Sequence, residues 1–269
     1  ESVALAWRFP GLASKDFEVL QVVSQVLYNG KAGLIDLDLN QQQKVLNSYG
    51  YPMGLADYSA FILGGLPKQG QTLEEVKDLL LNEIKKLRAG EFDEKMLQAN
   101  INNFKLYELQ SMESNEGRAD IFVNSFINGT NWKDEVTAID RMAKLTKEDI
   151  VAFADKYLKE DNYAVVYKKQ GKDPNEKKMT KPEITPIVSN RDVASPFLTS
   201  IQENAVKPIE PVFLDFKKDM SQLTAKSDIP VLYKQNTTND LFQLIYRHIH
   251  DLVIQRRCII LIGYRKFPL

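Results

Sequence analysis

The pattern of apolar positions predicts a strand at the start of the chain and a helix directly after it. Alternate positions are apolar, the period of a half-buried β-strand, at Val3, Leu5, Trp7 and Phe9. A helix then begins at Ser14 or Asp16, because apolar residues recur from there at three- and four-residue steps until Asn29-Gly30. This order predicts an amphipathic helix packed on a sheet.

The central part of the chain predicts four successive amphipathic helices. Thr72 is followed three residues later by Glu75, a capping box that satisfies the free N–H groups of a first helical turn. The apolar stripe of this first helix consists of Leu73, Val76, Leu80, Ile84 and Leu87. Asp93 is the expected cap of the second helix, the third runs from about Gly117 to Asn128, and Thr146 opens the fourth.

Further strands complete the prediction. Residues 58–67 and 163–167 are rich in β-branched and aromatic residues and are expected to be strands. Residues 31–40 are ambiguous by their pattern alone, and residues 47–52 have the composition of a turn. The resulting order predicts an α+β fold, a two-layer sandwich of a mostly antiparallel sheet with helices packed on one face.

A change of composition predicts the domain boundaries. Six of the eleven prolines lie in one stretch, at Pro174, Pro182, Pro186, Pro196, Pro208 and Pro211. Proline removes backbone donors and favours extended chain, so this stretch is expected to be a linker. The predicted organisation is residues 1–170 as an α+β domain, 171–211 as the linker, 212–246 as the start of a further, incomplete domain, and 247–269 as an atypical tail.

Two segments after the linker, 213–216 and 229–236, are expected to be the opening strands of this further domain. The tail leaves two interpretations open. Residues from about Arg247 onward are either a frame-shifted or vector-derived sequence or the final strand of the incomplete domain.

Composition excludes several classes of function. Apolar residues make up 43% and charged residues 26% of the 269-residue chain, which is ordinary for a globular protein. The net charge of −1 provides no field that would attract nucleic acid or an acidic membrane, and no apolar run is long enough to span a bilayer. The single cysteine, Cys258, excludes an internal disulfide framework and is compatible with the cytosol, an organelle matrix or a bacterial periplasm.

An ordered set of motifs over roughly residues 1–170 resembles the pitrilysin/insulinase family of zinc metallopeptidases. The motifs are Leu87-Arg-Ala-Gly90, Glu94-Lys-Met-Leu97, Glu113-Ser-Asn-Glu-Gly-Arg-Ala119, Ile139-Asp-Arg-Met142, Leu145-Thr-Lys-Glu-Asp-Ile150 and Lys156-Tyr-Leu158. The family carries an inverted metal motif, His-x-x-Glu-His, and includes catalytically inactive relatives. The resemblance is to the second, non-catalytic domain of the family, in which a glycine-bearing segment leads into a helix, and it implies a helix at residues 34–44 of this chain.

The resemblance implies part of a zinc metalloendopeptidase that degrades peptides in a clamshell chamber, with this segment forming chamber wall. Zinc is then expected in an upstream domain of the same protein, and peptides are the expected substrates. The strand-like start at Glu1 is interpreted as a cut inside a longer protein. The alternative function is a non-catalytic structural or partner subunit of a processing-peptidase-like assembly.

The chain itself predicts no catalytic residue and no metal ligand. It contains two histidines, His248 and His250, which could hold a metal with Asp251 only loosely, and it lacks His-x-x-Glu-His. Glutamates near helix starts, at positions 74, 75, 91 and 94, are expected to have capping roles. Arg118 and Asp120 lie in a motif, and Arg118 is expected to pair with Glu113 or Glu116 on the helix surface.

Two further motifs point to structure more than to binding. Gly64-Gly65 lacks the spacing of a nucleotide-binding loop and predicts a β-bulge. Asn128-Gly-Thr and Asn236-Thr-Thr match the glycosylation triplet without any sign of a secretory pathway. Substrate-binding residues are not identifiable from these patterns.

Overall fold

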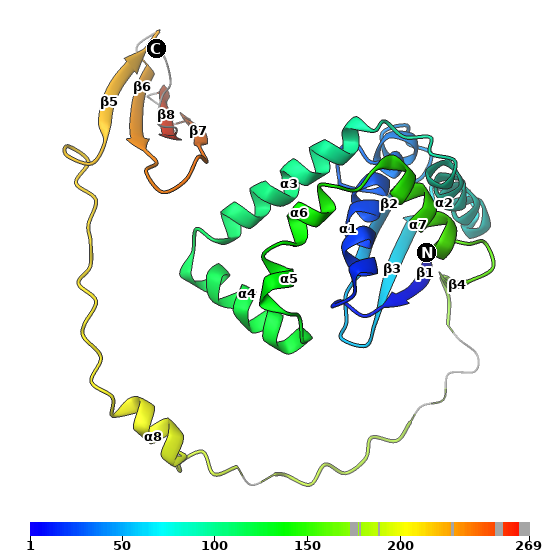
Figure 1. Ribbon diagram of the computed structural model, residues 1–269, viewed down its shortest axis with the longest axis horizontal. Helices are drawn as coiled ribbons and strands as arrows, with labels where there is room; N and C mark the ends of the chain where they lie inside the picture. Colours follow the sequence, from blue (N-terminus) through cyan, green and yellow to red (C-terminus); the bar gives the residue numbers. More distant parts are fainter. Residues whose placement is uncertain (173–176, 178, 188, 227–228, 251–254, 264–269) are drawn as a thin grey trace. The chain divides into compact units, whose positions relative to one another are not determined.

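A computed structural model describes most of the chain, which forms two compact units, Glu1–Lys177 and Lys178–Leu269 (Figure 1). The described residues are 1–172, 177, 179–187, 189–226, 229–250 and 255–263, with the backbone alone for 246–250 and 255–263. Within this part of the chain, no helix is both long and apolar enough to cross a membrane.

The first unit is built on a four-stranded sheet in the order β2-β3-β1-β4. The central strand β1 (Ser2–Pro10) pairs with β3 (Tyr58–Leu66) on one side and with β4 (Tyr163–Lys168) on the other. β2 (Asn47–Met53) pairs with the far side of β3, and all three pairings are antiparallel.

The prediction of a turn at residues 47–52 is therefore wrong, because this segment is the edge strand β2. Gly50 lies over the core, where an added Cβ would stand 3.2 Å from Leu63 and 3.3 Å from Phe61. Pro52 is tolerated because an edge strand leaves one row of backbone groups unpaired. The glycine and the proline that give this segment the composition of a turn are thus explained by close packing and by the edge position of the strand.

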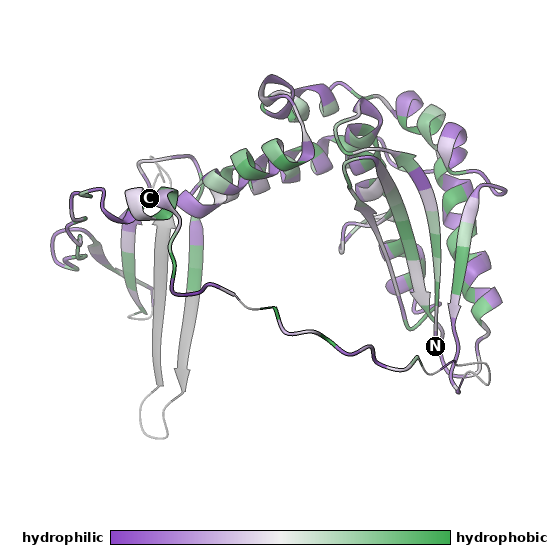
Figure 2. Cartoon of the chain, turned by 90° about the horizontal axis from the view of Figure 1, so that it is seen from below, coloured by the Kyte–Doolittle hydropathy of each residue, from purple (hydrophilic) through white to green (hydrophobic). Residues whose placement is uncertain are grey.

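One face of the sheet carries the core. Val3, Leu5, Trp7 and Phe9 alternate along β1 as predicted and are all buried. Three helices cover this face: α1 (Lys15–Leu27), α2 (Leu73–Arg88) and α7 (Lys147–Tyr157). Figure 2 shows runs of hydrophobic residues on the strands and on the helices of this unit. The arrangement is the two-layer α+β sandwich that the periodicity predicts.

Caps set the starts of these helices where the sequence predicts them. The Thr72 hydroxyl accepts from the Glu75 amide at 3.2 Å, and the Glu75 carboxylate accepts from the Thr72 amide at 2.7 Å. Thr146 and Asp149 repeat the capping box at α7, and Ser14 caps α1. Each cap satisfies backbone donors that a first turn leaves free.

The remaining helices of the unit are α3 (Lys95–Ser111), α4 (Asn115–Asn128), α5 (Trp132–Glu135) and α6 (Ala138–Met142). α3 and α4 confirm the predicted second and third helices, whereas the short α5 and α6 have too few residues for a periodic pattern. Residues 34–44 are less regular than predicted, since two helical residues lead into the π-helix η1 (Asp36–Asn40).

Gly64 and Gly65 do not form a bulge. The register of β3 against β1 runs through them without interruption. An added Cβ on Gly64 would stand 2.3 Å from the Tyr49 ring, and one on Gly65 would stand 2.5 Å from Val76. The two glycines therefore allow a tyrosine to cover one face of β3 and helix α2 to pack on the other.

The second unit contains α8 (Pro196–Gln202) and a sheet in the order β5-β6-β8-β7. The strand predicted at 229–236 is confirmed as β6 (Ile229–Gln235), but residues 213–216 are not a strand. There the Asp215 carbonyl accepts from the Lys218 and Asp219 amides, which makes a turn.

The tail continues this second sheet. β5 (Ser221–Ala225) pairs with β6, and β6 pairs in parallel with β8 (Gln255–Gly263). β8 in turn pairs antiparallel with β7 (Gln243–His250). Both interpretations of the tail stay open, because a frame-shifted or vector-derived sequence can also pair as a strand. Residues 251–254 and 264–269 of the tail lie outside the described residues.

The boundary near residue 170 stays a prediction that proteolysis can test. The described residues between 179 and 194 belong to no helix or strand and have exposed side chains. Because such backbone is open to a protease, brief digestion is expected to cut first within residues 171–211 and to leave a resistant core close to 1–170. Mass spectrometry of the first fragments checks this, and initial cuts inside residues 72–158 would refute the boundary.

Candidate functional site

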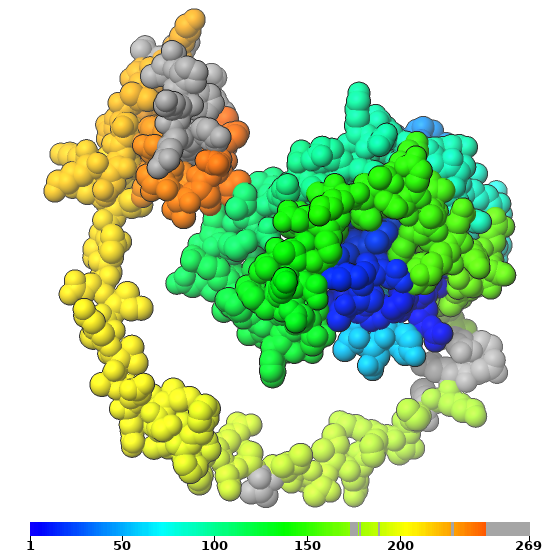
Figure 3. All heavy atoms as spheres, viewed as in Figure 1, coloured from blue at the N-terminus to red at the C-terminus, as the bar shows by residue number. Residues whose placement is uncertain are grey.

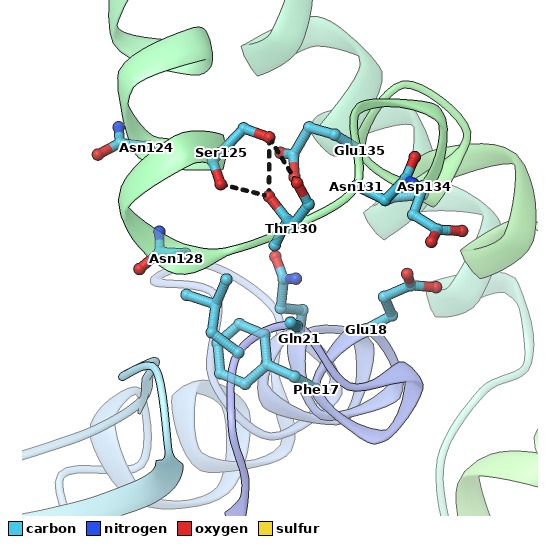
Figure 4. A pocket seen from close by; sticks show the side chains of 13 residues that line it. Phe17, Glu18, Gln21, Asn124, Ser125, Asn128, Thr130, Asn131, Asp134 and Glu135 are labelled. Carbon is cyan, nitrogen blue, oxygen red and sulfur yellow. Dashed lines mark hydrogen bonds between the residues drawn. The ribbon is translucent and has the colours of Figure 1, made fainter.

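A pocket of about 340 Å³ lies in the first unit between α1 and the segment that joins α4 to α5 (Figure 4). In Figure 3 the blue atoms of the N-terminal segment lie directly beside the green atoms of the segment from α4 to α6. The pocket is lined by Leu12, Ala13, Phe17, Glu18, Gln21, Asn124, Ser125, Asn128, Thr130, Asn131, Asp134, Glu135 and Ala138.

The wall on the α4 side is held by a closed set of hydrogen bonds. Gly129 ends α4 with φ +64°, a left-handed conformation that suits glycine, and turns the chain toward α5. The Thr130 hydroxyl donates to the Ser125 hydroxyl at 2.9 Å, and the Ser125 hydroxyl contacts the Thr130 carbonyl at 3.2 Å. Asn131 then caps α5 by accepting from the Lys133 amide. These bonds fix the turn.

The wall on the α1 side is held by ion pairs. Arg141 of α6 donates to both oxygens of Glu18, at 2.9 and 2.6 Å, and this hydrogen bonding raises the pKa of the guanidinium. Lys15 donates to Asp134 at 2.9 Å, which raises the pKa of Lys15 and lowers that of Asp134. The bidentate geometry orients α1 against α6.

Three carboxamides in the pocket are unused by the protein. Among the described residues, the side chains of Gln21, Asn124 and Asn128 have no hydrogen-bond partner. Phe17, which is 8% exposed, contributes an apolar surface beside them. The pocket therefore combines carboxamides and carboxylates with an apolar surface, and Asn124 is open to solvent.

The pocket shows no hydroxyl hydrogen-bonded to a base. The hydroxyls of Ser125 and Thr130 bond to each other, no described hydrogen bond joins either of them to a carboxylate of the pocket, and no histidine lines it. Without a base in hydrogen-bond reach a serine hydroxyl is a poor nucleophile. No catalytic role is therefore assigned to the Ser125 hydroxyl.

The described side chains of this chain form no site for zinc. Among the described residues, no group of three His, Cys, Asp or Glu side chains could hold a metal ion. His248 and His250 lie two apart on β7, their side chains are not described, and Asp251 falls outside the described residues. The prediction of no metal ligand in this chain remains open to experiment, and no chemical step is assigned to a metal here.

The other predicted positions have structural surroundings. Glu75 is engaged in its capping box, where the Thr72 amide lowers the pKa of its carboxyl, and Glu74 lies in the same first turn. Glu94 precedes α3 without a side-chain cap bond. Arg118 donates to the backbone carbonyls of Ser114 and Glu113, at 3.3 and 3.4 Å, and thereby closes the start of α4.

Sequence patterns missed both the pocket and a buried ion cluster. Glu83 lies on the core side of α2 and is 1% exposed. Its position within the apolar stripe of this helix is the sequence signal that could have predicted its burial. Lys86 contacts Glu83 at 2.9 Å and Asp38 of η1 at 2.5 Å. Burial raises the pKa of Glu83, whereas the hydrogen bond from Lys86 lowers that of Asp38. Lys86 thus pairs with both carboxyl groups of this cluster.

Known proteins are similar to the first part of the chain. Residues 1–104 match the model of the peptidase M16 inactive domain. The zinc protease PqqE of Helicobacter pylori is 27% identical over 174 residues, which cover 63% of this chain and 38% of that protein. This chain thus spans about two fifths of that relative's length.

Solved structures share the fold. The inactive peptidase domain of a Bordetella parapertussis protein superposes with a TM-score of 0.56 at 17% identity, over 65% of this chain and 96% of that chain. A peptidase M16 inactive domain from Pseudomonas fluorescens superposes with a TM-score of 0.53 at 12% identity, over 61% of this chain and 40% of that chain. The solved structures thus share the fold of the first unit, and the match of residues 1–104 to the M16 inactive domain confirms the resemblance that the sequence motifs indicate.

Proposed function

We propose that this chain contributes a non-catalytic domain to a zinc metalloendopeptidase and that the domain forms part of the wall of a peptide-degrading chamber. The observation that carries the proposal is the match of residues 1–104 to the M16 inactive domain. The 27% identity to a zinc protease supports zinc as the metal of the complete protein.

The chemistry requires a second domain. Peptide hydrolysis by a metallopeptidase takes a metal with an open coordination position, which polarises the scissile carbonyl and lowers the pKa of a bound water to about 7. The described residues of this chain provide no ligand set of that kind. The zinc site is accordingly expected on another domain of the same protein.

The sheet of the first unit offers a surface for a wall. The residues of β1 that point away from α1 and α2, such as Ala4 and Ala6, are half-buried, and Val166 on β4 is 65% exposed. This face carries small and apolar side chains and is not covered by the helices of its own unit. A flat, rigid sheet of this kind can exclude water and align an extended peptide when another domain faces it.

A hydrolysis assay tests the proposal. A quenched fluorogenic peptide is incubated with this chain alone, with the complete protein that includes the zinc-bearing domain, and with the complete protein whose general-base glutamate is replaced by glutamine. Cleavage is expected only from the unmodified complete protein, with loss in a chelator and a fall of about 10²–10⁴-fold in the glutamine variant.

Two results would overturn the proposal. Chelator-sensitive cleavage by this chain alone would show that it holds its own metal site. A complete protein that binds zinc at no position and cleaves no peptide would instead indicate a structural or partner subunit.

A further inference from the structure

We propose that Asn29 is a site of self-catalysed modification, at which the chain converts the asparagine to aspartate and isoaspartate with water as the co-reactant. The chain contains two Asn-Gly dipeptides, Asn29-Gly30 and Asn128-Gly129. The sequence alone does not distinguish them, because glycine has no side chain to shield the main-chain nitrogen in either. Their surroundings in the structure are opposite, and those of Asn29 favour the reaction. The inference does not depend on the proposed function.

The dipeptide supplies every group that the reaction needs except water. The main-chain nitrogen of the glycine loses its proton and attacks the Cγ atom of the asparagine. The Cγ–Nδ2 bond then breaks, ammonia leaves, and a succinimide ring remains. Water opens this ring at either carbonyl, which gives aspartate in one case and isoaspartate in the other. Because nucleophile and carbonyl belong to neighbouring residues, the attack is intramolecular and needs no further catalyst to bring them together.

The first argument is the state of the attacking nitrogen. Four of the five amides from Asn29 to Gly33 donate hydrogen bonds to the side-chain oxygens of asparagine or aspartate. Among the described residues, the Gly30 amide has no acceptor. Gly30 is exposed, and an added Cβ would meet nothing within 4 Å. Its N–H is therefore open to water, which can take the proton that the attack requires.

Asn128-Gly129 has the opposite arrangement. Asn128 is the last residue of α4, and the Gly129 amide donates to the Phe126 carbonyl at 3.2 Å. The Thr130 amide donates to the Ser125 carbonyl at 3.0 Å, so both amides after the helix close its end. Ring closure requires rotation of the backbone between the asparagine Cα and the glycine nitrogen, which would break these bonds. The helix end therefore protects this asparagine.

The second argument is the support for the negative charge that develops on Oδ1. As the nitrogen attacks Cγ, electrons move onto this side-chain oxygen. In Asn29 it accepts from the Lys31 amide at 3.0 Å and from the Ala32 amide at 2.8 Å. Two backbone donors on one oxygen form the arrangement that stabilises an oxyanion in acyl transfer. The Asn128 side chain has no hydrogen-bond partner within the described part of the chain, so its oxygen lacks this support.

The Asn29 carboxamide is also held in one orientation. Its Nδ2 atom donates to the Gln25 carbonyl near the end of α1, at 3.1 Å. This bond keeps Oδ1 directed at the two amides and the amine directed away from them. The carbonyl carbon is thus presented in the polarised form that a nucleophile attacks.

The product differs from asparagine in charge and in backbone length. Asp36 is 4% exposed, and its Oδ2 atom accepts from the amides of Asn29 and Gly33, both at 3.0 Å. Isoaspartate at position 29 adds a methylene group to the main chain between these two amides, so they no longer fit the same oxygen. Its carboxylate also adds a negative charge beside Asp36. The modification is therefore expected to loosen the start of η1.

Peptide mapping by liquid chromatography and mass spectrometry tests the site on the full 269-residue chain. The chain is aged in mildly alkaline buffer, and digests at intervals give the fraction of each Asn-Gly peptide that has the mass of an acid in place of an amide. Synthetic peptides with aspartate or isoaspartate identify the products by retention time. The Asn29 peptide is expected to convert at least about tenfold faster than the Asn128 peptide, since a single oxyanion donor contributes about 10²–10³-fold in enzymes.

The unfolded chain provides the control for the motif itself. In concentrated guanidinium chloride both dipeptides lose their surroundings, so their rates are expected to converge. Folding is expected to slow Asn128 and to leave Asn29 at least as fast as in the unfolded chain. Asn29→Gln is expected to stop conversion at this position, because its longer side chain would have to close a larger ring. Hydrogen exchange at the Gly33 amide is expected to be faster in the aged chain than in the Asn29→Gln variant aged alongside it.

Equal rates at the two positions of the folded chain, or faster conversion at Asn128, would overturn the proposal. It would equally fail if folding slowed Asn29 by about tenfold or more, because the loop would then protect the asparagine where two oxyanion donors should promote attack. The comparison of folded and unfolded chain depends on no variant. None of these measurements involves zinc or peptide hydrolysis, so their outcome is independent of the hydrolysis assay.

Discussion

Replacing Trp7 by alanine is expected to lower the free energy of unfolding of the first unit by about 3–5 kcal/mol. Trp7 lies in the central strand β1 and is 1% exposed. Its ring contacts Tyr163 at 5.3 Å and Phe61 at 6.4 Å between centroids, so it joins β1 to both neighbouring strands. Its Nε1 also donates to the Lys159 carbonyl at 3.1 Å, which would lose this partner.

Denaturant unfolding followed by far-UV circular dichroism measures the change, and the chain offers a matched control. Trp132 is the second of the two tryptophans, is 43% exposed and stacks on Phe122 at the surface. Trp132→Ala is expected to cost less than about 1.5 kcal/mol, since an exposed aromatic pair contributes little beyond its contact area. Equal losses in the two variants would show that β1 is not the centre of the core.

The elements that the sequence predicts well are those whose local signals agree with their packing. In α2, the capping box at Thr72, the apolar stripe from Leu73 to Leu87 and the glycine at position 90 all specify the same helix. In β1, the two-residue period coincides with burial against the helices on one face. Agreement between propensity and tertiary burial makes such segments readable from the sequence alone.

The elements that the sequence does not predict depend on contacts with residues outside the segment itself. Residues 47–52 have turn-like composition, yet Gly50 and Pro52 suit an edge strand beside Leu63. η1 departs from a regular helix where the Asp36 carboxylate accepts from the amides of Asn29 and Gly33. Neither contact produces a periodic pattern of apolar residues, so neither can be predicted from the sequence.

The pocket is invisible in the sequence for a related reason. Gln21 and Asn124 are about a hundred residues apart, and each looks like an ordinary polar position on a helix surface. Only the short segments α5 and α6, which carry too few residues for a periodic signal, return the chain to α1. Binding sites assembled across such connections follow from the fold and not from local patterns.

Replacing Lys86 by methionine is expected to destabilise the first unit by about 3 kcal/mol near neutral pH, because it leaves the buried Glu83 and the partly buried Asp38 without their cation. The Glu83 side chain is 2% exposed, and its Oε2 atom has no hydrogen-bond partner in the described structure. Lys86 lies 2.9 Å from the other oxygen, Oε1, and also contacts Asp38. Methionine would retain the packing of the stem and remove only the ammonium group.

A neighbouring lysine provides the control. Lys85 is 57% exposed and contacts Glu160 at 3.6 Å on the surface. Lys85→Met is expected to change stability by less than about 0.5 kcal/mol, since an exposed ion pair contributes little. Urea unfolding of both variants and of the unmodified chain gives the comparison, and equal effects of the two substitutions would contradict the assignment.

The pH dependence of the Lys86→Met variant gives the sharper test. In the unmodified chain the hydrogen bond from Lys86 depresses the pKa of Asp38, so Asp38 contributes stability above the ordinary carboxyl pKa of about 4, and this is lost as pH falls through the lowered value. The pKa of Glu83 is raised, so its effect on stability changes with pH in the opposite direction. Its contribution to stability is fully present below about pH 4 and is lost as pH rises through the pKa of the folded state.

In the variant, both carboxyl groups are expected to have higher pKa values because the ammonium group is absent. The folded variant therefore binds protons more tightly than its unfolded chain. The deficit of the variant relative to the unmodified chain should therefore be largest near pH 7 and shrink toward about pH 5. A deficit that stays constant over this range would show that Lys86 stabilises the fold through its packing and not through its charge.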